Sequence, residues 1–293
     1  MHAYYTAREE SMNGSLRQRQ NGIVKKNNNV IQEVEERKYD EDHDTLNLME
    51  QLMVMSLRKQ TTTLLSINIT GEKLSLALRG ALLIELELNG YIALEKKTQF
   101  NYKLSDRKVI AKRTDRISDS LMNQCMTHII KYSGKYNIRT WILLLSGQSL
   151  NFMMIHTHIR LMRERICKNL VEKGVLECGF ETNFFLTMHS FKFKNREEQR
   201  KVLIKFQKGL LSGYQVEYTK FDPRVLALIY LTFAAEAENL PTECLSDDDY
   251  VRAMNNLYKI KNSNFNELAM KRSDNFGEIF WGVFDVFKSL FNL

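Results

Sequence analysis

Three arginines stand close together in the segment 159–190, which reads IRLMRERICKNLVEKGVLECGFETNFFLTMHS. Arg160 and Arg163 are three residues apart, so they would share one face of a helix. Each guanidinium group is a planar fork of donors that matches phosphate oxygens two at a time. Arg165 would lie about 200° round the helix from Arg163, at roughly 3.6 residues per turn, and point elsewhere. At this spacing, Arg160 and Arg163 can converge on one phosphate. The alternative is a solvated helix face whose ion pairs contribute under about 1 kcal/mol each.

An apolar hairpin is expected directly after these arginines, over about 175–191. Gly174 ends the predicted helix, and three consecutive apolar residues follow in the hairpin, Phe184, Phe185 and Leu186. Cations beside exposed apolar side chains are typical of a surface that meets an anionic membrane. An inserted phenylalanine contributes around 1.5–3 kcal/mol of transfer free energy, so one such contact is marginal alone. The alternative is that these three side chains pack into the core.

The chain shows no pattern of a catalytic or metal site. His156 and His158 are two residues apart and would face away from each other on a helix. The sequence contains no GxGxxG, GxxxxGK[ST], HExxH or GxSxG motif. Three acidic residues, Asp247–Asp249, follow Ser246, which is typical of a helix N-terminus. The four cysteines show no CxxC spacing and are expected to be reduced thiols. We therefore expect no enzyme, no cofactor and no metal.

The elements that must position the arginines are mostly helical by composition. The 293 residues are 44% hydrophobic and include 2 prolines, which favours a mainly helical fold. The net charge of +7 suits nucleic acid, a membrane surface or an acidic partner. No window reaches the roughly 18 apolar residues of a membrane span, and MHAYYTAREE lacks the apolar run of a signal peptide. Any membrane contact is therefore expected to be peripheral.

Two parts of the chain differ in composition. Residues 1–43 are poor in large apolar residues and are predicted to form a disordered tail. Within the tail, Leu16–Arg19 is a short basic motif, LRQR, that a partner could bind; the alternative is a solvated leader. Residues 44–293 are predicted to form a single helical domain, with Asp44 or Thr45 capping its first helix.

Hydrophobic periodicity predicts the elements of that domain. A strand or extended segment is expected over 62–70, and a small β-hairpin region over 91–110. The helix that starts at Pro223 has apolar residues nearly all round and should be buried in a bundle core. The other helices are expected over residues 72–89, 117–132, 141–145, 149–173, 195–212, 248–260 and 277–291.

Seven stretches of the chain, taken in order, resemble the Golgi phosphoprotein 3 family. The longest signatures are ALRGALLIELELNG and RERICKNLVEKGVL, which chance does not readily produce. The stretches are TLNLMEQLMVMSLR (45–58), LALRGALLIELELNGYI (76–92), TWILLLSG (140–147), HIRLMRERICKNLVEKGVL (158–176), NFFLTM (183–188), RVLALIYL (224–231) and IFWGVFDVF (279–287).

The resemblance implies a helical bundle core with surrounding amphipathic helices and a protruding β-hairpin. It implies a peripheral protein on the cytoplasmic face of the trans-Golgi, also present in the cytosol, that binds phosphatidylinositol 4-phosphate. It further implies an adaptor role. The protein would bind the cytoplasmic tails of glycosyltransferases and coatomer, so that these enzymes are retained in the Golgi or returned to it by retrograde sorting. The hairpin residues Phe184, Phe185 and Leu186 would touch the bilayer and support homo-oligomer contacts. Arg17 and Arg19 would belong to the coatomer-binding motif of the tail.

The family's headgroup pocket can be carried over residue by residue. Its arginine in the ALRG motif is Arg79 here, and its two basic residues three apart are Arg160 and Arg163. Its tryptophan is missing, because counting back from Arg79 without a gap places Thr70 at that position. Threonine supplies neither an amphipathic ring at the membrane boundary nor a wall for the pocket. We therefore expect weaker or more avidity-dependent lipid binding.

Two other functions stay open at this point. One is a divergent family member with weakened lipid binding that acts only as a protein-interaction scaffold, which the Thr70 departure supports. The other is a helical nucleic-acid-binding protein that uses the same basic face. Single-strand binders stack bases on aromatic residues among the cations, and no aromatic residue lies near Arg160 and Arg163. Nucleic acid is therefore not the expected partner.

Overall fold

A computed structural model describes residues 46–57, 62–63, 71–98, 103–149, 152–183, 186–212, 222–237, 242, 245–271 and 276–291. These residues belong to the compact unit Leu46–Leu293. They are mainly helical, which confirms the predicted fold class. The tail predicted over 1–43 lies outside the described residues, and the domain boundary at 44 stays a prediction.

The helices follow the predicted order, apart from the segment 149–173, described below, and α12, which was not predicted. Their bounds are α2 (Leu48–Ser56), α4 (Glu72–Leu88), α5 (Ser120–Lys131), α6 (Ile138–Ser146), the 3-10 helix η1 (Phe152–Thr157), α7 (Met162–Glu172), α8 (Glu197–Leu211), α9 (Pro223–Ala234), α11 (Asp247–Lys261), α12 (Phe265–Met270) and α13 (Glu278–Phe291).

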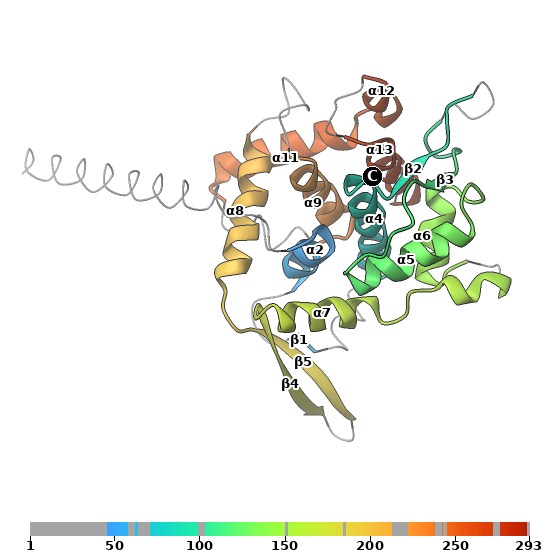
Figure 1. Ribbon diagram of the computed structural model, residues 1–293. Helices are drawn as coiled ribbons and strands as arrows, with labels where there is room; N and C mark the ends of the chain where they lie inside the picture. The colour runs from blue at the N-terminus through green and yellow to red at the C-terminus, as the bar shows by residue number, and fades with distance from the viewer. Residues whose placement is uncertain are drawn as a thin grey trace, which may run out of the picture. The chain divides into compact units, whose positions relative to one another are not determined.

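Two small antiparallel sheets accompany the helices. The first has the strand order β1 (Thr62–Thr63), β5 (Leu186–Phe193), β4 (Leu176–Asn183), and the second pairs β2 (Ile92–Leu94) with β3 (Val109–Ala111). In the β4–β5 hairpin, Leu176 lies opposite Phe193 and Asn183 opposite Leu186. The hairpin extends beyond α7 (Figure 1), as the sequence predicts.

Helix α4 packs against α2, α6, α9 and α13 (Figure 1), so it is the centre of the described core. A Cβ atom added at Gly80 would lie 2.5 Å from the ring of Phe287 on α13. Only a residue without a side chain therefore allows this close approach, which gives the glycine of the ALRG motif a structural role. Helix α9 is buried on all sides from Val225 to Ala234, which confirms the prediction made from its apolar pattern.

An acidic residue near the end of α4, Glu87, binds the start of α13. Its two carboxylate oxygens accept the backbone N–H groups of Ile279 and Phe280, each at 2.7 Å. These are donors that a helix N-terminus otherwise leaves unpaired. Burial raises the pKa of Glu87 to about 8, against the opposing effect of the two hydrogen bonds. The carboxylate fits because Gly277, directly before α13, has no Cβ.

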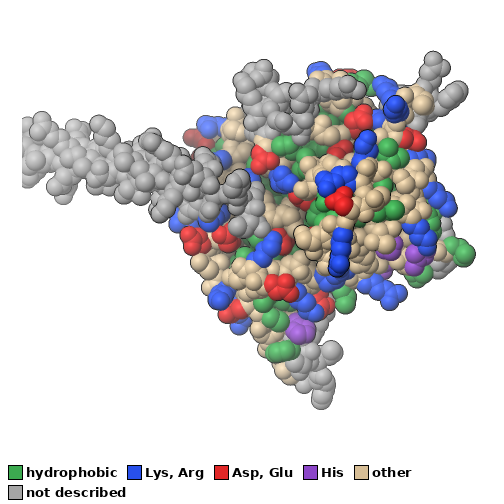
Figure 2. Space-filling model, in the orientation of Figure 1, with side chains coloured by type: hydrophobic (Ala, Val, Ile, Leu, Met, Phe, Trp, Pro, Cys, Tyr) green, Lys and Arg blue, Asp and Glu red, His purple; other side chains and the backbone are tan. Residues whose placement is uncertain are grey.

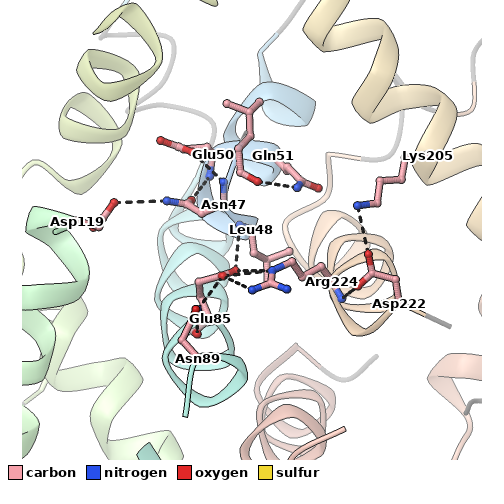
Figure 3. Close-up of polar contacts among 11 residues, drawn as sticks. Asn47, Leu48, Glu50, Gln51, Glu85, Asn89, Asp119, Lys205, Asp222 and Arg224 are labelled. Carbon is pink, nitrogen blue, oxygen red and sulfur yellow. Dashed lines mark hydrogen bonds and ion pairs between the residues drawn. The ribbon is translucent and has the colours of Figure 1, made fainter. Parts of the chain in front are cut away.

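The start of α2 is held by a network that reaches α4 and α9 (Figure 3). Asn47 caps the helix by accepting from Glu50 N at 3.0 Å, and the Glu50 carboxylate accepts from Asn47 N at 2.9 Å. The predicted cap at Asp44 or Thr45 is therefore wrong by two or three residues. The reciprocal pair of Asn47 and Glu50 is a capping box, which fixes the helix start more strongly than one hydroxyl or carboxyl group.

The prediction of one helix over 149–173 is wrong. The chain forms η1, then an irregular stretch, and α7 begins only at Met162. Leu161 adopts the left-handed conformation, with φ of 52°, which a continuous helix does not allow. The N–H of Ile159 donates to the carbonyl of Leu145 on α6 at 3.0 Å, so this stretch is tied to a neighbouring helix instead of to itself. Arg160 therefore precedes α7 and does not share a helix face with Arg163.

None of the described helices combines the length and the apolar character needed to cross a membrane.

The ion pair between Glu85 and Arg224 generates a stability prediction. The side chain of Glu85 is buried, pairs with Arg224 at 2.7 Å and also accepts from Leu48 N at 3.2 Å. Arg224→Met leaves this carboxylate buried without its cation, so we expect the free energy of unfolding to fall by about 2–3 kcal/mol, somewhat below the typical loss because Arg224 is partly exposed. Urea denaturation measures the change.

Two controls test the cause of that loss. Lys205→Met removes a cation from the more exposed pair with Asp222, at 3.3 Å, and should change the free energy of unfolding by under about 1 kcal/mol. The double variant Glu85→Gln/Arg224→Met, which has no buried charge to compensate, should recover part of the stability. An Arg224→Met protein as stable as the Lys205→Met protein would contradict the interpretation.

Candidate functional site

Arg79 is a buried guanidinium group in the middle of α4. Its residue is 4% exposed. Nε donates to the carbonyl of Leu145 at 3.2 Å, and Nη2 donates to the carbonyl of Ile159 at 2.9 Å. Nη1 donates to the carbonyl and hydroxyl oxygens of Ser75, at 2.8 and 2.7 Å. All of these acceptors are neutral, so the described residues give Arg79 hydrogen bonds without a compensating negative charge.

These hydrogen bonds fix the position of the segment before α7. Helix α6 ends at Gly147, whose φ of 79° is left-handed, and the carbonyl of Leu145 in its last turn lacks a partner within the helix. This carbonyl accepts from Arg79 and from the N–H of Ile159. The carbonyl of Ile159 in turn accepts from Arg79. Helix α4, the end of α6 and the chain beside Arg160 are therefore joined through one side chain.

Arg160 and Arg163 differ in exposure and in partners. Arg160 is exposed, and its side chain has no hydrogen-bond or ion-pair partner among the described residues. Arg163, in the first turn of α7, is half-buried, and its Nη2 donates to the carbonyl of Gly71, the residue before α4. Arg160 is therefore available to a ligand, whereas Arg163 also connects the beginnings of α7 and α4.

The charges of these residues act on one another. Burial, followed by the charge of Arg163, lowers the pKa of Arg79 to about 10. The pKa of His158 is lowered from its ordinary value, first by burial and then by the charges of Arg79 and Arg160. Burial also lowers the pKa of Arg163. We call Arg79, His158, Arg160 and Arg163 the cationic cluster.

The N-terminus of α7 lies in the same place. Its N-cap residue is Leu161, which has no side-chain oxygen to accept the first backbone N–H groups of the helix. Unpaired N–H groups and the helix dipole favour an anion at such an end. The cluster and the helix end together provide convergent donors and positive charge, which is the chemistry that binds a phosphate group.

The structure brings together the described members of the predicted pocket. Arg79, Arg160 and Arg163 all belong to the cationic cluster, although Arg160 arrives on a turn and not on a helix. Arg165 points elsewhere, as predicted, and donates from Nη1 to Gln124 Oε1 at 2.6 Å. Leu186 begins β5, and only its backbone is described. The other predicted residues lie outside the described residues, namely Thr70, Phe184, Phe185, Arg17 and Arg19.

Sequence reasoning considered His158 only as a metal ligand and did not include it in the pocket. A Cβ atom added at Gly147 would lie 2.9 Å from Nδ1 of His158, so the imidazole ring packs on the end of α6. Ser75 was also missed, although it precedes Arg79 by four residues, the spacing at which helical side chains meet. Nothing in the sequence indicates that His158 lies near Arg79, because a fold contact between α4 and the end of α6 creates that proximity.

Within the described part of the chain, no group of three or more His, Cys, Asp or Glu side chains could hold a metal ion.

Two comparisons with known proteins agree on the family. Residues 48–272 match the family model described as Golgi phosphoprotein 3. The chain is also similar to vacuolar protein sorting-associated protein 74 of Eremothecium gossypii. The two sequences are 30% identical over 254 residues, which cover 84% of this chain and 76% of that protein.

The contacts of Arg79 predict a structural role besides any ligand role. Lysine at this position has one compact ammonium group and cannot reach the carbonyls of both Leu145 and Ile159 in the geometry of the guanidinium fork. We expect Arg79→Lys to lower the free energy of unfolding by about 2 kcal/mol, the range for losing hydrogen bonds to a buried charge.

Arg160→Lys is the matched control, because it makes the same chemical change at an exposed residue of the cluster. It should alter stability by under about 0.5 kcal/mol. Equal stability of the two variants in urea denaturation would show that the buried hydrogen bonds of Arg79 do not hold the three segments together.

Proposed function

The chain belongs to the Golgi phosphoprotein 3 family, and from this premise we propose that it is a peripheral Golgi adaptor that binds phosphatidylinositol 4-phosphate through the cationic cluster. The adaptor role is supported by the family description and by the relative whose name assigns it to vacuolar protein sorting. The lipid is supported by the charge and donor arrangement of the cluster.

The observation that carries the lipid proposal is the uncompensated charge of buried Arg79. Buried charges in proteins are normally paired, because desolvation strongly disfavours an isolated ion. Arg79 has only neutral acceptors among the described residues, and the charge that acts on its pKa is the cation of Arg163. A bound anion would supply the missing negative charge. It would also reverse the electrostatic effect that now lowers the pKa of His158.

A phosphate monoester suits the donors that the cluster offers. It carries about −1.5 to −2 charges near neutral pH and three acceptor oxygens. Arg160 is exposed and has no partner among the described residues, so its whole fork can bind these oxygens. A guanidinium group has five N–H donors, and the hydrogen bonds of Arg79 leave an N–H of Nη2 for a ligand. The N-terminus of α7 adds backbone donors on the same side.

Stable membrane attachment would need more than one headgroup. The proposed further contacts are the hairpin residues Phe184, Phe185 and Leu186 and contacts between copies of the chain. Several weak contacts on one surface add through effective concentration. This matters here because Thr70 replaces the pocket tryptophan of the family, directly before Gly71, whose carbonyl Arg163 contacts.

The adaptor role completes the proposal. The protein would bind the tails of glycosyltransferases while its basic motif at Arg17 and Arg19 contacts coatomer, so that the enzymes are retained in the Golgi or returned to it. These partners follow from the family resemblance and from the LRQR motif. The lipid would then select the membrane on the cytoplasmic face of the trans-Golgi on which these contacts form.

Vesicle flotation tests the lipid proposal. Vesicles with phosphatidylinositol 4-phosphate should bind the protein more tightly than vesicles of equal charge made with phosphatidylserine. Arg160→Ala/Arg163→Ala should weaken binding to the former at least about tenfold, since each lost charged hydrogen bond is worth about 1.5–3 kcal/mol.

Arg165→Ala is the matched control for Arg160→Ala, because it removes the same charge next to the cluster from a side chain that contacts Gln124 and Ser120 instead. It should leave the preference for phosphatidylinositol 4-phosphate intact. Unchanged binding of the double variant, or equal losses in Arg160→Ala and Arg165→Ala, would contradict the assignment of the pocket.

His158 predicts a pH dependence of binding. Its pKa is lowered in the free protein and would rise beside a bound anion, so binding takes up a proton and strengthens as pH falls. The phosphate itself protonates near pH 6, which acts in the opposite direction. The ratio of wild-type to His158→Gln affinity removes that shared effect and should increase as pH falls from about 7.5 to 5.5. A ratio independent of pH would exclude His158 from the ligand site.

A further inference from the structure

Among the described side chains in and just after η1, three large apolar ones are exposed. Met153 is 84% exposed, Ile155 is 59% exposed and Leu161 is 70% exposed. The residues between them alternate in burial, since Met154 and Thr157 face the core. The segment is therefore folded against the protein by one set of side chains, while a second set, which includes these three apolar residues together with His156 and Arg160, points outward.

Hydrogen bonds hold this segment on both sides. The hydroxyl group of Tyr132, at the end of α5, lies 2.9 Å from Nε2 of His156. The hydroxyl group of Thr157 donates to the carbonyl of Met154 at 2.7 Å. At the other end, the carbonyl of Ile159 accepts from Arg79. The outward position of the three apolar side chains is therefore fixed by the fold.

The sequence that contains these side chains is positively charged. Between Ser120 and Arg163 the sequence contains no Asp or Glu, but it contains Lys131, Lys135, Arg139 and the cationic cluster residue Arg160. The ammonium groups of Lys131 and Lys135 lie 5.3 and 5.6 Å from the ring centre of Tyr132. Figure 2 shows basic, histidine and hydrophobic side chains together at the edge where η1 lies in Figure 1.

We propose that Met153, Ile155 and Leu161 form an apolar wedge that enters an anionic phospholipid surface beside the headgroup site. The inference rests on the proposed function and assigns the membrane a contact in addition to the hairpin. Leu161 directly follows Arg160. When Arg160 binds a lipid phosphate, the wedge therefore lies at the boundary between the headgroups and the acyl chains. Arginine and lysine at the rim keep their charges among the headgroups.

A lipid surface fits these residues better than a protein partner. Histidines and Arg160 separate the apolar side chains along the chain, so they act as separate tips and not as a continuous patch. Tyr132 with its two lysines is the combination of aromatic ring and cation that gathers at membrane interfaces. The absence of acidic residues from Ser120 to Arg163 removes a source of repulsion from anionic lipids.

The wedge and the hairpin lie at opposite ends of α7 (Figure 1). Helix α7 runs from Met162 to Glu172, which is about 16 Å at roughly 1.5 Å per residue. Contacts at both ends would set the orientation of the domain on the bilayer, with Arg160 inside the wedge segment and Arg163 between the two contacts.

The test separates insertion from headgroup binding. The wedge variant is Met153→Ser/Ile155→Ser/Leu161→Gly, in which glycine tolerates the left-handed conformation of residue 161 and adds no side-chain oxygen at the start of α7. We expect its affinity for vesicles with phosphatidylinositol 4-phosphate to fall at least about tenfold. Its affinity for soluble inositol 1,4-bisphosphate, which has no acyl chain, should equal that of the wild type.

A matched control changes exposed apolar residues elsewhere. Val251→Ser/Tyr258→Ser/Met270→Ser alters three side chains of α11 and α12 that are each more than half exposed, and vesicle binding should stay unchanged. As a direct readout, Met153→Trp should shift its fluorescence to shorter wavelength with vesicles and be quenched by lipids brominated on the acyl chain.

Several outcomes overturn the inference. Wild-type vesicle affinity in the wedge variant, or an unquenched tryptophan at position 153, would exclude insertion. A change in sedimentation mass without a change in vesicle affinity would assign the wedge to contacts between copies of the chain. If the wild type binds no inositol 1,4-bisphosphate but the tryptophan inserts into phosphatidylserine vesicles, the proposed function fails and the wedge stands.

Discussion

The described core depends on the hydrogen bonds that the buried guanidinium group of Arg79 donates. One side chain of α4 binds a carbonyl at the end of α6 and a carbonyl just before α7, so three separate segments share a single cation. No acidic residue among its hydrogen-bond partners in the described part of the chain balances that cation. The hydrogen bonds therefore stabilise the fold, while the charge stays available to a ligand.

Three ionisable groups of helix α4 are stabilised in three different ways. Glu85 is paired with Arg224, so its charge is neutralised inside the protein (Figure 3). Glu87 accepts two backbone N–H groups of α13, and burial raises its pKa. Arg79 is the cation of the three, and the like charge of Arg163 acts on it. Of these groups, Arg79 is the one that stays charged at neutral pH without an ion-pair partner among the described residues.

Much of the fold was predictable because its local signals agree with its tertiary environment. The apolar residues of α9 run all round the helix, and the helix is buried on all sides. The close packing of Gly80 against Phe287 explains why the ALRG motif contains a glycine. The segment 149–173 was wrongly predicted, because its apolar residues suit a helix while a carbonyl of α6 and Arg79 bind its backbone from outside. Arg160 and Arg163 were singled out by their type and spacing and Arg79 through the resemblance, whereas His158 depends on a long-range contact that periodicity does not encode.

Arg79 both joins separate segments, through contacts such as that with the carbonyl of Ile159, and belongs to the proposed ligand site. Ligand binding therefore has a consequence for the lifetime of the protein in the cell. A ligand that binds only the folded chain stabilises it in proportion to the logarithm of its concentration over its dissociation constant. Under the proposed function, the copies attached to a membrane are therefore harder to unfold than the copies in the cytosol. Quality control by chaperones and proteases acts on unfolded chains, so it removes unattached copies preferentially. The abundance of the protein would then follow the amount of its lipid, without any dedicated regulator.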